Sequence, residues 1–159
     1  MPSQRLRATT KVRLTGFTVV ELLIVVALIL TIAAIAVPNL LSAIYRAKVA
    51  RTVADVRTIG NAVLGYQASY GQCPDTLAQV GYGGSLDPWG NPYQYLSFAD
   101  TNGKGKMRKD RFLVPINSNF DLYSMGADGA SVSPLTAKAS RDDVIWASDG
   151  SFIGLASDY

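Results

Sequence analysis

The chain has 159 residues, a net charge of +3, one cysteine and no histidine. The length allows one compact domain plus an extension. The lone Cys73 excludes an intrachain disulfide, and the lack of histidine excludes Ser-His-Asp, Cys-His and histidine-based metal chemistry. The net positive charge comes largely from four basic residues, without an acidic one, that precede a long apolar run. No long basic face follows that run, so we do not expect a nucleic-acid partner. A signal-anchored enzyme is an alternative that the missing histidines disfavour, and we expect no enzyme.

The apolar run spans residues 17–37, and as a helix rising about 1.5 Å per residue it would cross the ~30 Å hydrocarbon core of a membrane. One reading is a signal anchor. Another is a cleavable secretory signal with an A-x-A-like site at residues 34–36, which is less favoured because the run exceeds the usual apolar region of about 7–15 residues. A cytoplasmic N-terminus is predicted by the basic residues ahead of the run, Arg5, Arg7, Lys11 and Arg13.

One acidic residue, Glu21, lies a single helical turn into this run. An ionisable side chain at the centre of a membrane helix costs roughly 2.5–3.5 kcal/mol on insertion scales, and less near an end. Glu21 therefore requires a partner.

The residues around Glu21 carry a recognisable pattern. Gly16-Phe17-Thr18 followed by Val19-Val20-Glu21-Leu22-Leu23 resembles the class III signal of type IV pilins and type II secretion pseudopilins. The resemblance implies that a prepilin peptidase removes a basic leader, residues 1–16, by cutting after Gly16, and methylates the new amine of Phe17. It also implies a membrane-spanning and polymerising helix over residues 17–38, softened near its end by Pro38.

Cleavage would supply a partner for Glu21. The resemblance favours an ion pair between this carboxylate and the Phe17 amine of a neighbouring subunit, which would set the register of a filament. Pairing within one helix is the alternative, because Phe17 and Glu21 are one turn apart.

An amphipathic helix is predicted over residues 39–71. Its apolar stripe is expected to lie on a folded head, and Gly71 and Pro74 provide the stop signals. Pro38 should kink or loosen the helix over residues 34–38. The stripe recurs at steps of four and three, at Val49, Val53, Val56, Gly60, Val63 and Tyr70.

The head, residues 72–159, is rich in loops. Residues 93–98, 111–116 and 121–124 alternate as strands do, so we expect a small antiparallel sheet of about three strands packed on the helix, with a long C-terminal loop: an α+β, pilin-like fold. A solvated loop is predicted for the basic, glycine-broken run Lys104, Lys106, Arg108, Lys109 and Arg111.

Two motifs in the head, "DPWGNPYQY" (87–95) and "DLYSMGADG" (121–129), resemble the major pseudopilins of type II secretion systems. The likeness covers residues 16–98 and 120–147, and it leaves out an insertion at 99–119 and the C-terminal tail. It implies a structural subunit of a periplasmic pseudopilus that drives protein export. The implied partners are copies of itself, the prepilin peptidase, minor pseudopilins and an inner-membrane assembly platform. A type IV pilus subunit for adhesion or motility is the alternative.

The same resemblance implies calcium in the C-terminal loop. Met125 would offer its carbonyl, and Asp128 and Asp143 their carboxylates, with Asp142 and Ser131 as less certain ligands. Hard oxygen ligands of this kind suit calcium. Ordinary turn aspartates are the alternative, because Asp-Gly is a common turn pair.

Overall fold

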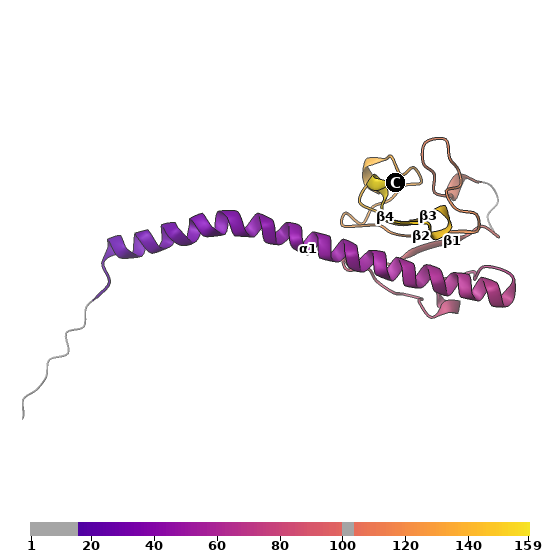
Figure 1. Ribbon diagram of the computed structural model, residues 1–159, viewed down its shortest axis with the longest axis horizontal. Coiled ribbons are helices and arrows are strands. Elements are labelled where there is room, and N and C mark those ends of the chain that lie inside the picture. The colour runs from indigo at the N-terminus through magenta and orange to yellow at the C-terminus, as the bar shows by residue number, and fades with distance from the viewer. Residues whose placement is uncertain (1–15, 100–103) are drawn as a thin grey trace, which may run out of the picture. The chain divides into compact units, whose positions relative to one another are not determined.

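The computed structural model describes residues 16–99 and 104–159 (Figure 1). The described chain forms one long helix and one antiparallel sheet of four strands in the order β1-β2-β3-β4, so the predicted α+β class is confirmed. The elements are α1 (Val19–Tyr70), β1 (Gln94–Ser97), β2 (Phe120–Ser124), β3 (Val144–Ala147) and β4 (Phe152–Leu155).

The chain divides into two units, residues 1–41 and residues 42–159, of which the second contains the sheet. Apart from Gly16, the predicted leader lies outside the described residues. The helical assignment of α1 runs through Pro38 without a break. The loosening expected around residues 34–38 stays a prediction.

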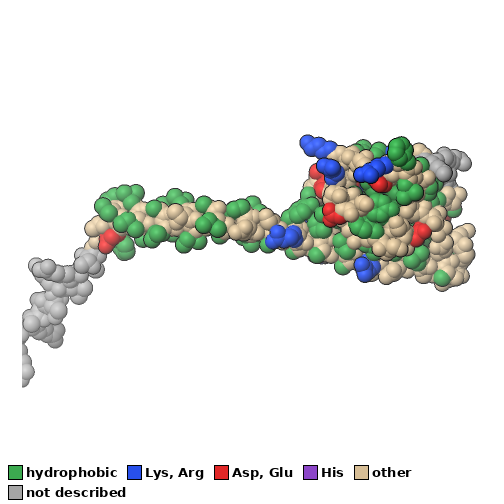
Figure 2. Space-filling view, turned by 45° about the horizontal axis from the view of Figure 1, so that its top comes forward, with side chains coloured by type: hydrophobic (Ala, Val, Ile, Leu, Met, Phe, Trp, Pro, Cys, Tyr) green, Lys and Arg blue, Asp and Glu red, His purple; other side chains and the backbone are tan. Residues whose placement is uncertain are grey.

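The first part of α1, up to residue 41, exposes its large apolar side chains all round. Val19, Leu30 and Ile35 are each more than 60% exposed, and Val26, at 45%, is the least exposed of the large apolar residues of this stretch. Figure 2 shows hydrophobic side chains covering the drawn face of this part of the helix. A surface that is apolar on every side has no buried face in a water-soluble unit, and it suits lipid or other helices.

The second part of α1 packs on the sheet through one stripe. Val56, Gly60 and Val63 are buried as predicted, and Thr52 and Ile59 are buried beside them. Of the other predicted stripe positions, Val49 and Val53 are partly buried against the same core. Tyr70 is 69% exposed and contacts Tyr66 instead of the sheet, so its predicted place in the stripe is wrong. α1 ends as expected, before Gly71, whose φ of 74° is one that glycine adopts at little cost.

The sheet is covered on both faces (Figure 1). Alternate residues of β2 and β3, including Leu122 and Trp146, face α1 in the larger core. Ile145 and Ala147 face the other way, into a second core with Ile116 and Leu135. Loops from residues 104–118 and 127–143 supply that second layer, so all four residues of β3 are buried.

The strand predictions at 93–98 and 121–124 are confirmed as β1 and β2, but the one at 111–116 is wrong. Arg111 has a φ of 47°, and Asp110 and Leu113 bond to each other across a tight turn, at 3.0 and 2.7 Å. Pro115 has no N–H to donate to a ladder. β3 and β4 were not predicted. β3 is buried on both faces, and such a strand shows no alternation.

Gly60 is the point of closest approach between α1 and the sheet. A Cβ there would lie 2.3 to 2.9 Å from three ring carbons of Trp146, closer than van der Waals contact allows. Gly60→Ala should therefore lower the free energy of unfolding by about 1–3 kcal/mol. Chemical denaturation of the detergent-solubilised full chain measures this.

The matched control is Gly65→Ala, on the same helix, where a Cβ would meet no atom within 4 Å. There the better helix propensity of alanine should raise stability by up to about 1 kcal/mol. Equal effects of the two substitutions would contradict the close packing of Gly60 on Trp146.

Candidate functional site

Thr18 and Glu21 form a capping box at the N-terminus of α1. The backbone N–H and the hydroxyl of Thr18 both donate to Oε2 of Glu21, each at 2.9 Å, and the N–H of Glu21 donates back to the Thr18 hydroxyl at 3.1 Å. This is the Thr-x-x-Glu pattern, which satisfies N–H groups that the first turn of a helix leaves unpaired. The pattern is readable in the sequence, but the sequence reasoning missed it.

The capping box bears on the predicted partner of Glu21. Both Thr18 donors use the same carboxylate oxygen, Oε2. Oε1 can therefore accept from another group without breaking the box. In the uncleaved chain the nitrogen of Phe17 is a peptide nitrogen, so an ion pair between the Phe17 amine and Glu21 requires prior cleavage. Both pairings predicted from the sequence stay predictions.

α1 is also the one helix within residues 16–99 and 104–159 that is long and apolar enough to cross a membrane, and its most apolar window has no buried residue. Pro38, predicted to act in assembly, lies inside it.

The two head motifs meet in the structure. Asp87 is buried and accepts hydrogen bonds from the N–H groups of Trp89 and Asn91, both at 2.9 Å, and from the hydroxyl of Ser124 at 2.6 Å. The side-chain amide of Asn91 donates to the carbonyl of Gly126 at 3.0 Å. The motifs therefore form one hydrogen-bonded junction between the turn before β1 and the end of β2.

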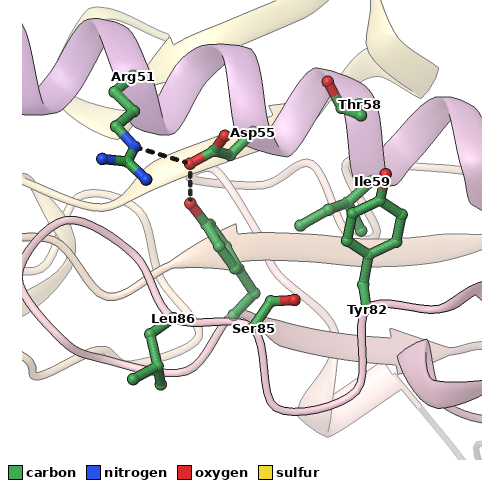
Figure 3. A pocket seen from close by; sticks show the side chains of 8 residues that line it. Arg51, Asp55, Thr58, Ile59, Tyr82, Ser85 and Leu86 are labelled. Atoms are coloured by element: carbon green, nitrogen blue, oxygen red, sulfur yellow. Dashed lines mark hydrogen bonds and ion pairs between the residues drawn. The ribbon is translucent and has the colours of Figure 1, made fainter.

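A groove of about 290 Å³ lies between α1 and the segment before β1 (Figure 3). The Tyr93 hydroxyl donates to Asp55 at 3.0 Å, and Arg51 lies 3.8 Å from the same carboxylate oxygen. Burial is the main cause that raises the pKa of Tyr93, so its hydroxyl is neutral and remains a donor. These contacts hold the segment on the helix, and we assign no chemistry to the groove.

The aspartates predicted to bind calcium make hydrogen bonds or an ion pair within the head. The Asp128 carboxylate accepts from the N–H of Ala130 at 2.8 Å, and Asp142 accepts from the N–H groups of Ala127 and Asp128 at 2.8 and 3.1 Å. These are the contacts of turn aspartates. Asp143 is fully buried.

The partner of Asp143 is Arg108. Its guanidinium forms an ion pair with Oδ2 of Asp143, and the same oxygen accepts from the Ser131 hydroxyl at 2.6 Å. Arg108 is itself only 2% exposed, so its predicted place in a solvated basic loop is wrong. Lys106 and Arg111 of that run are exposed, as expected.

The charge state of Asp143 follows from this environment. Burial is the largest influence and raises the pKa of the carboxyl to about 6, against the opposite effects of Ser131 and Arg108. The group is therefore ionised at neutral pH and pairs with Arg108 as a carboxylate.

Each of the three predicted carboxylate ligands already accepts a hydrogen bond within the head, and Asp143 also pairs with Arg108. No group of three or more His, Cys, Asp or Glu side chains in the described parts of the chain could hold a metal ion. Ser131 lies beside Asp143, as a hydrogen-bond donor. Calcium binding by Met125 and these residues stays a prediction, and the melting experiment described below decides it.

The family is decided by sequence comparison. Over 135 residues the chain is 33% identical to the type II secretion system core protein G of Pseudomonas aeruginosa, an alignment that covers 72% of this chain and 84% of that protein. The chain belongs to the core protein G family. The Vibrio cholerae core protein G is 31% identical over 135 residues, with 72% and 82% covered, and that of Aeromonas hydrophila is 29% identical over 140 residues, with 75% and 87% covered.

No family model and no solved structure matches the chain. Membership of the core protein G family confirms the resemblance that the two head motifs and the N-terminal signal indicated. Together with the one helix of the described residues that is apolar and long enough to cross a membrane, it makes the protein a membrane-anchored, single-pass subunit.

The junction of the two motifs gives a test. Asp87→Ala should lower the free energy of unfolding by about 2–4 kcal/mol, because the partly buried N–H groups of Trp89 and Asn91 and the buried Ser124 hydroxyl lose their acceptor. Urea denaturation of the solubilised chain measures it. Asp75→Ala is the control, since the exposed Asp75 carboxylate accepts a hydrogen bond from nearby Gln79, and its loss should change stability by less than about 0.5 kcal/mol. Equal losses would contradict the anchoring role of Asp87.

Proposed function

We propose that this core protein G, a structural subunit of the type II secretion pseudopilus, is cleaved after Gly16 and methylated at Phe17. It then polymerises through α1, and an ion pair between subunits fixes their register. In this proposal the protein supplies the helix surface on which subunits pack and the charges that set their register. It catalyses no reaction. The missing histidine supports this part of the proposal, because it removes the commonest general base.

One observation carries the proposal: an apolar helix exposed on all sides begins with a single carboxylate. In a membrane the lipid tails cover this surface. In a filament the same surface would be covered by the helices of other subunits, and Glu21 would be the one acidic group near its end, close to the ammonium that cleavage exposes at Phe17.

The capping box explains how Glu21 can lie at the membrane before assembly. Two hydrogen bonds from Thr18 satisfy Oε2 within the same chain, so the carboxylate does not need an ion pair to be tolerated. After cleavage, the ammonium of Phe17 from a neighbour can approach Oε1. Opposite charges attract strongly in a medium of low dielectric constant, and such pairs are best attested as devices that set register.

The proposed topology places the N-terminus in the cytoplasm and the head in the periplasm of a bacterial inner membrane. The basic residues predicted to hold the N-terminus inside are outside the described residues. The proposed partners are the prepilin peptidase, further copies of the chain, minor pseudopilins and the inner-membrane assembly platform.

A type IV pilus subunit is the other candidate, and the core protein G relatives weigh against it. Deletion of the gene in the native host separates the two. Loss of exoprotein release with normal attachment and twitching supports the secretion role, and the opposite pair of phenotypes contradicts it.

Processing predicts a defined mass. Intact-mass spectrometry of the membrane-extracted protein should show the loss of residues 1–16 and the gain of one methyl group on Phe17. An N-terminus at Val37 would instead identify the cleavable secretory signal.

If the charge of Glu21 sets the register between neighbouring subunits, Glu21→Gln should block filament formation. Glutamine can still accept the hydrogen bonds of Thr18, since Gln also serves in capping boxes, but it has no charge to attract an ammonium. Filament yield after shearing and membrane insertion after fractionation are the two measurements, and insertion should be normal.

Thr18→Val is the matched control, because it removes the hydroxyl of the box and keeps the carboxylate. It should still form filaments. A wild-type filament yield from Glu21→Gln would contradict the ion pair and leave Glu21 as a capping residue alone.

A further inference from the structure

The buried Arg108 is the most unusual side chain of the head. It comes from the segment 99–119, which the resemblance to the major pseudopilins leaves out. Its guanidinium donates to the Ser131 hydroxyl and, at 2.7 Å, to the carbonyl of Val132, and it forms the ion pair with Asp143. The ring of Tyr123 lies 4.2 Å from the guanidinium carbon.

The groups around this guanidinium are those that a bound cation would use. A carboxylate, a hydroxyl and a backbone carbonyl are the oxygen ligands that calcium takes in proteins. Arginine suits such a site because its planar guanidinium offers several donors in a fixed geometry, keeps its charge, and is weakly hydrated compared with an ammonium.

Arg108 also connects the segments that the second core requires. Its backbone N–H donates to Asp121 of β2 at 2.6 Å. Next to it, the N–H of Lys109 donates to the carbonyl of Ser133, and the N–H of Leu135 donates to the carbonyl of Lys109, at 3.1 and 2.9 Å. The arginine therefore lies where the inserted segment, the loop 127–143 and the sheet meet.

We propose that Arg108 is the internal cation of this head and takes the place that the family resemblance gives to calcium. The guanidinium neutralises Asp143 and closes the C-terminal loop on the sheet, so the loop is held without a metal ion. The head is then independent of calcium, and the inserted segment exists in part to deliver this side chain.

The remaining charges agree with this arrangement. Asp128 and Asp142 already accept from backbone N–H groups of their own loop. Oδ1 of Asp143 and Nε of Arg108 are buried and have no hydrogen-bond partner among the described residues. A divalent ion at that Oδ1 would lie beside a guanidinium, and two positive charges in a buried site repel each other strongly.

The test is thermal melting of the detergent-solubilised full chain in excess calcium and in excess EGTA, with retention of radioactive calcium on a filter as a second readout. Proteins that bind an ion only when folded melt higher when it is present. The expected result is the same melting temperature in both conditions, no retained calcium, and no change in either readout with Asp128→Ala. A melting temperature several degrees higher in calcium, or stoichiometric retention, would overturn the proposal.

Variants of Arg108 test whether its guanidinium stabilises the head by neutralising Asp143. Arg108→Gln should lower the melting temperature by several degrees, because it leaves a buried carboxylate without its cation. Arg108→Lys, which keeps the charge, should recover part of the loss. Arg111→Gln, an exposed change of the same kind in the same segment, should melt like the wild type. A wild-type melt for Arg108→Gln would overturn the proposal.

A double-mutant cycle distinguishes a charge pair from general packing. Asp143→Asn combined with Arg108→Gln should lose less than the sum of the two single losses, because each single variant leaves one buried charge uncompensated. Additive losses would overturn the proposal. If Arg108→Gln fails to fold, the calcium measurement on the wild type still decides. These readouts need no secretion or filament assay, so their failure leaves the pseudopilus function untouched.

Discussion

A carboxylate removed from water must be met by donors or by a cation, and this constraint governs both ends of the protein. At the start of α1, Thr18 donates twice to one oxygen of Glu21 and leaves the other able to accept. In the head, Arg108 and Ser131 meet Asp143. The two solutions suit different tasks. In the first, Oε1 of Glu21 is left able to accept from another group, as the proposed ion pair between subunits requires, whereas the second lies within the head of one chain.

The two parts of α1 show how one helix serves two media. Its first part has no polar face, so only lipid or other helices can cover it. Its second part concentrates burial on a single stripe, where Gly60 lets the helix lie directly against the ring of Trp146. The change from one pattern to the other marks the passage from an exposed apolar surface, which we propose serves assembly, to a surface for the head's own core. Core protein G membership gives this division its purpose, since a pseudopilus subunit needs both.

The sheet carries two cores, one on each of its faces. Residues beyond β1 fold back over the face opposite α1, with Ile116 and Leu135 against Ile145 of β3. This layer is made of loops, which backbone and side-chain hydrogen bonds hold on the sheet. Arg108 provides one of them, from its N–H to Asp121 of β2.

The sequence by itself determined the features that depend on local pattern. The apolar run, the stripe on the second part of α1, the stop at Gly71, and the strands β1 and β2 all follow from periodicity and turn chemistry, and the two motifs and the N-terminal signal indicated the family. Only the tertiary structure decided the rest. β3 lacks alternation because both its faces are covered, and Arg108 reads as one more charge in a basic run because its partners lie 23 to 35 residues further along the chain. Contacts between segments so far apart leave no local signal, and burial of a charge depends on them.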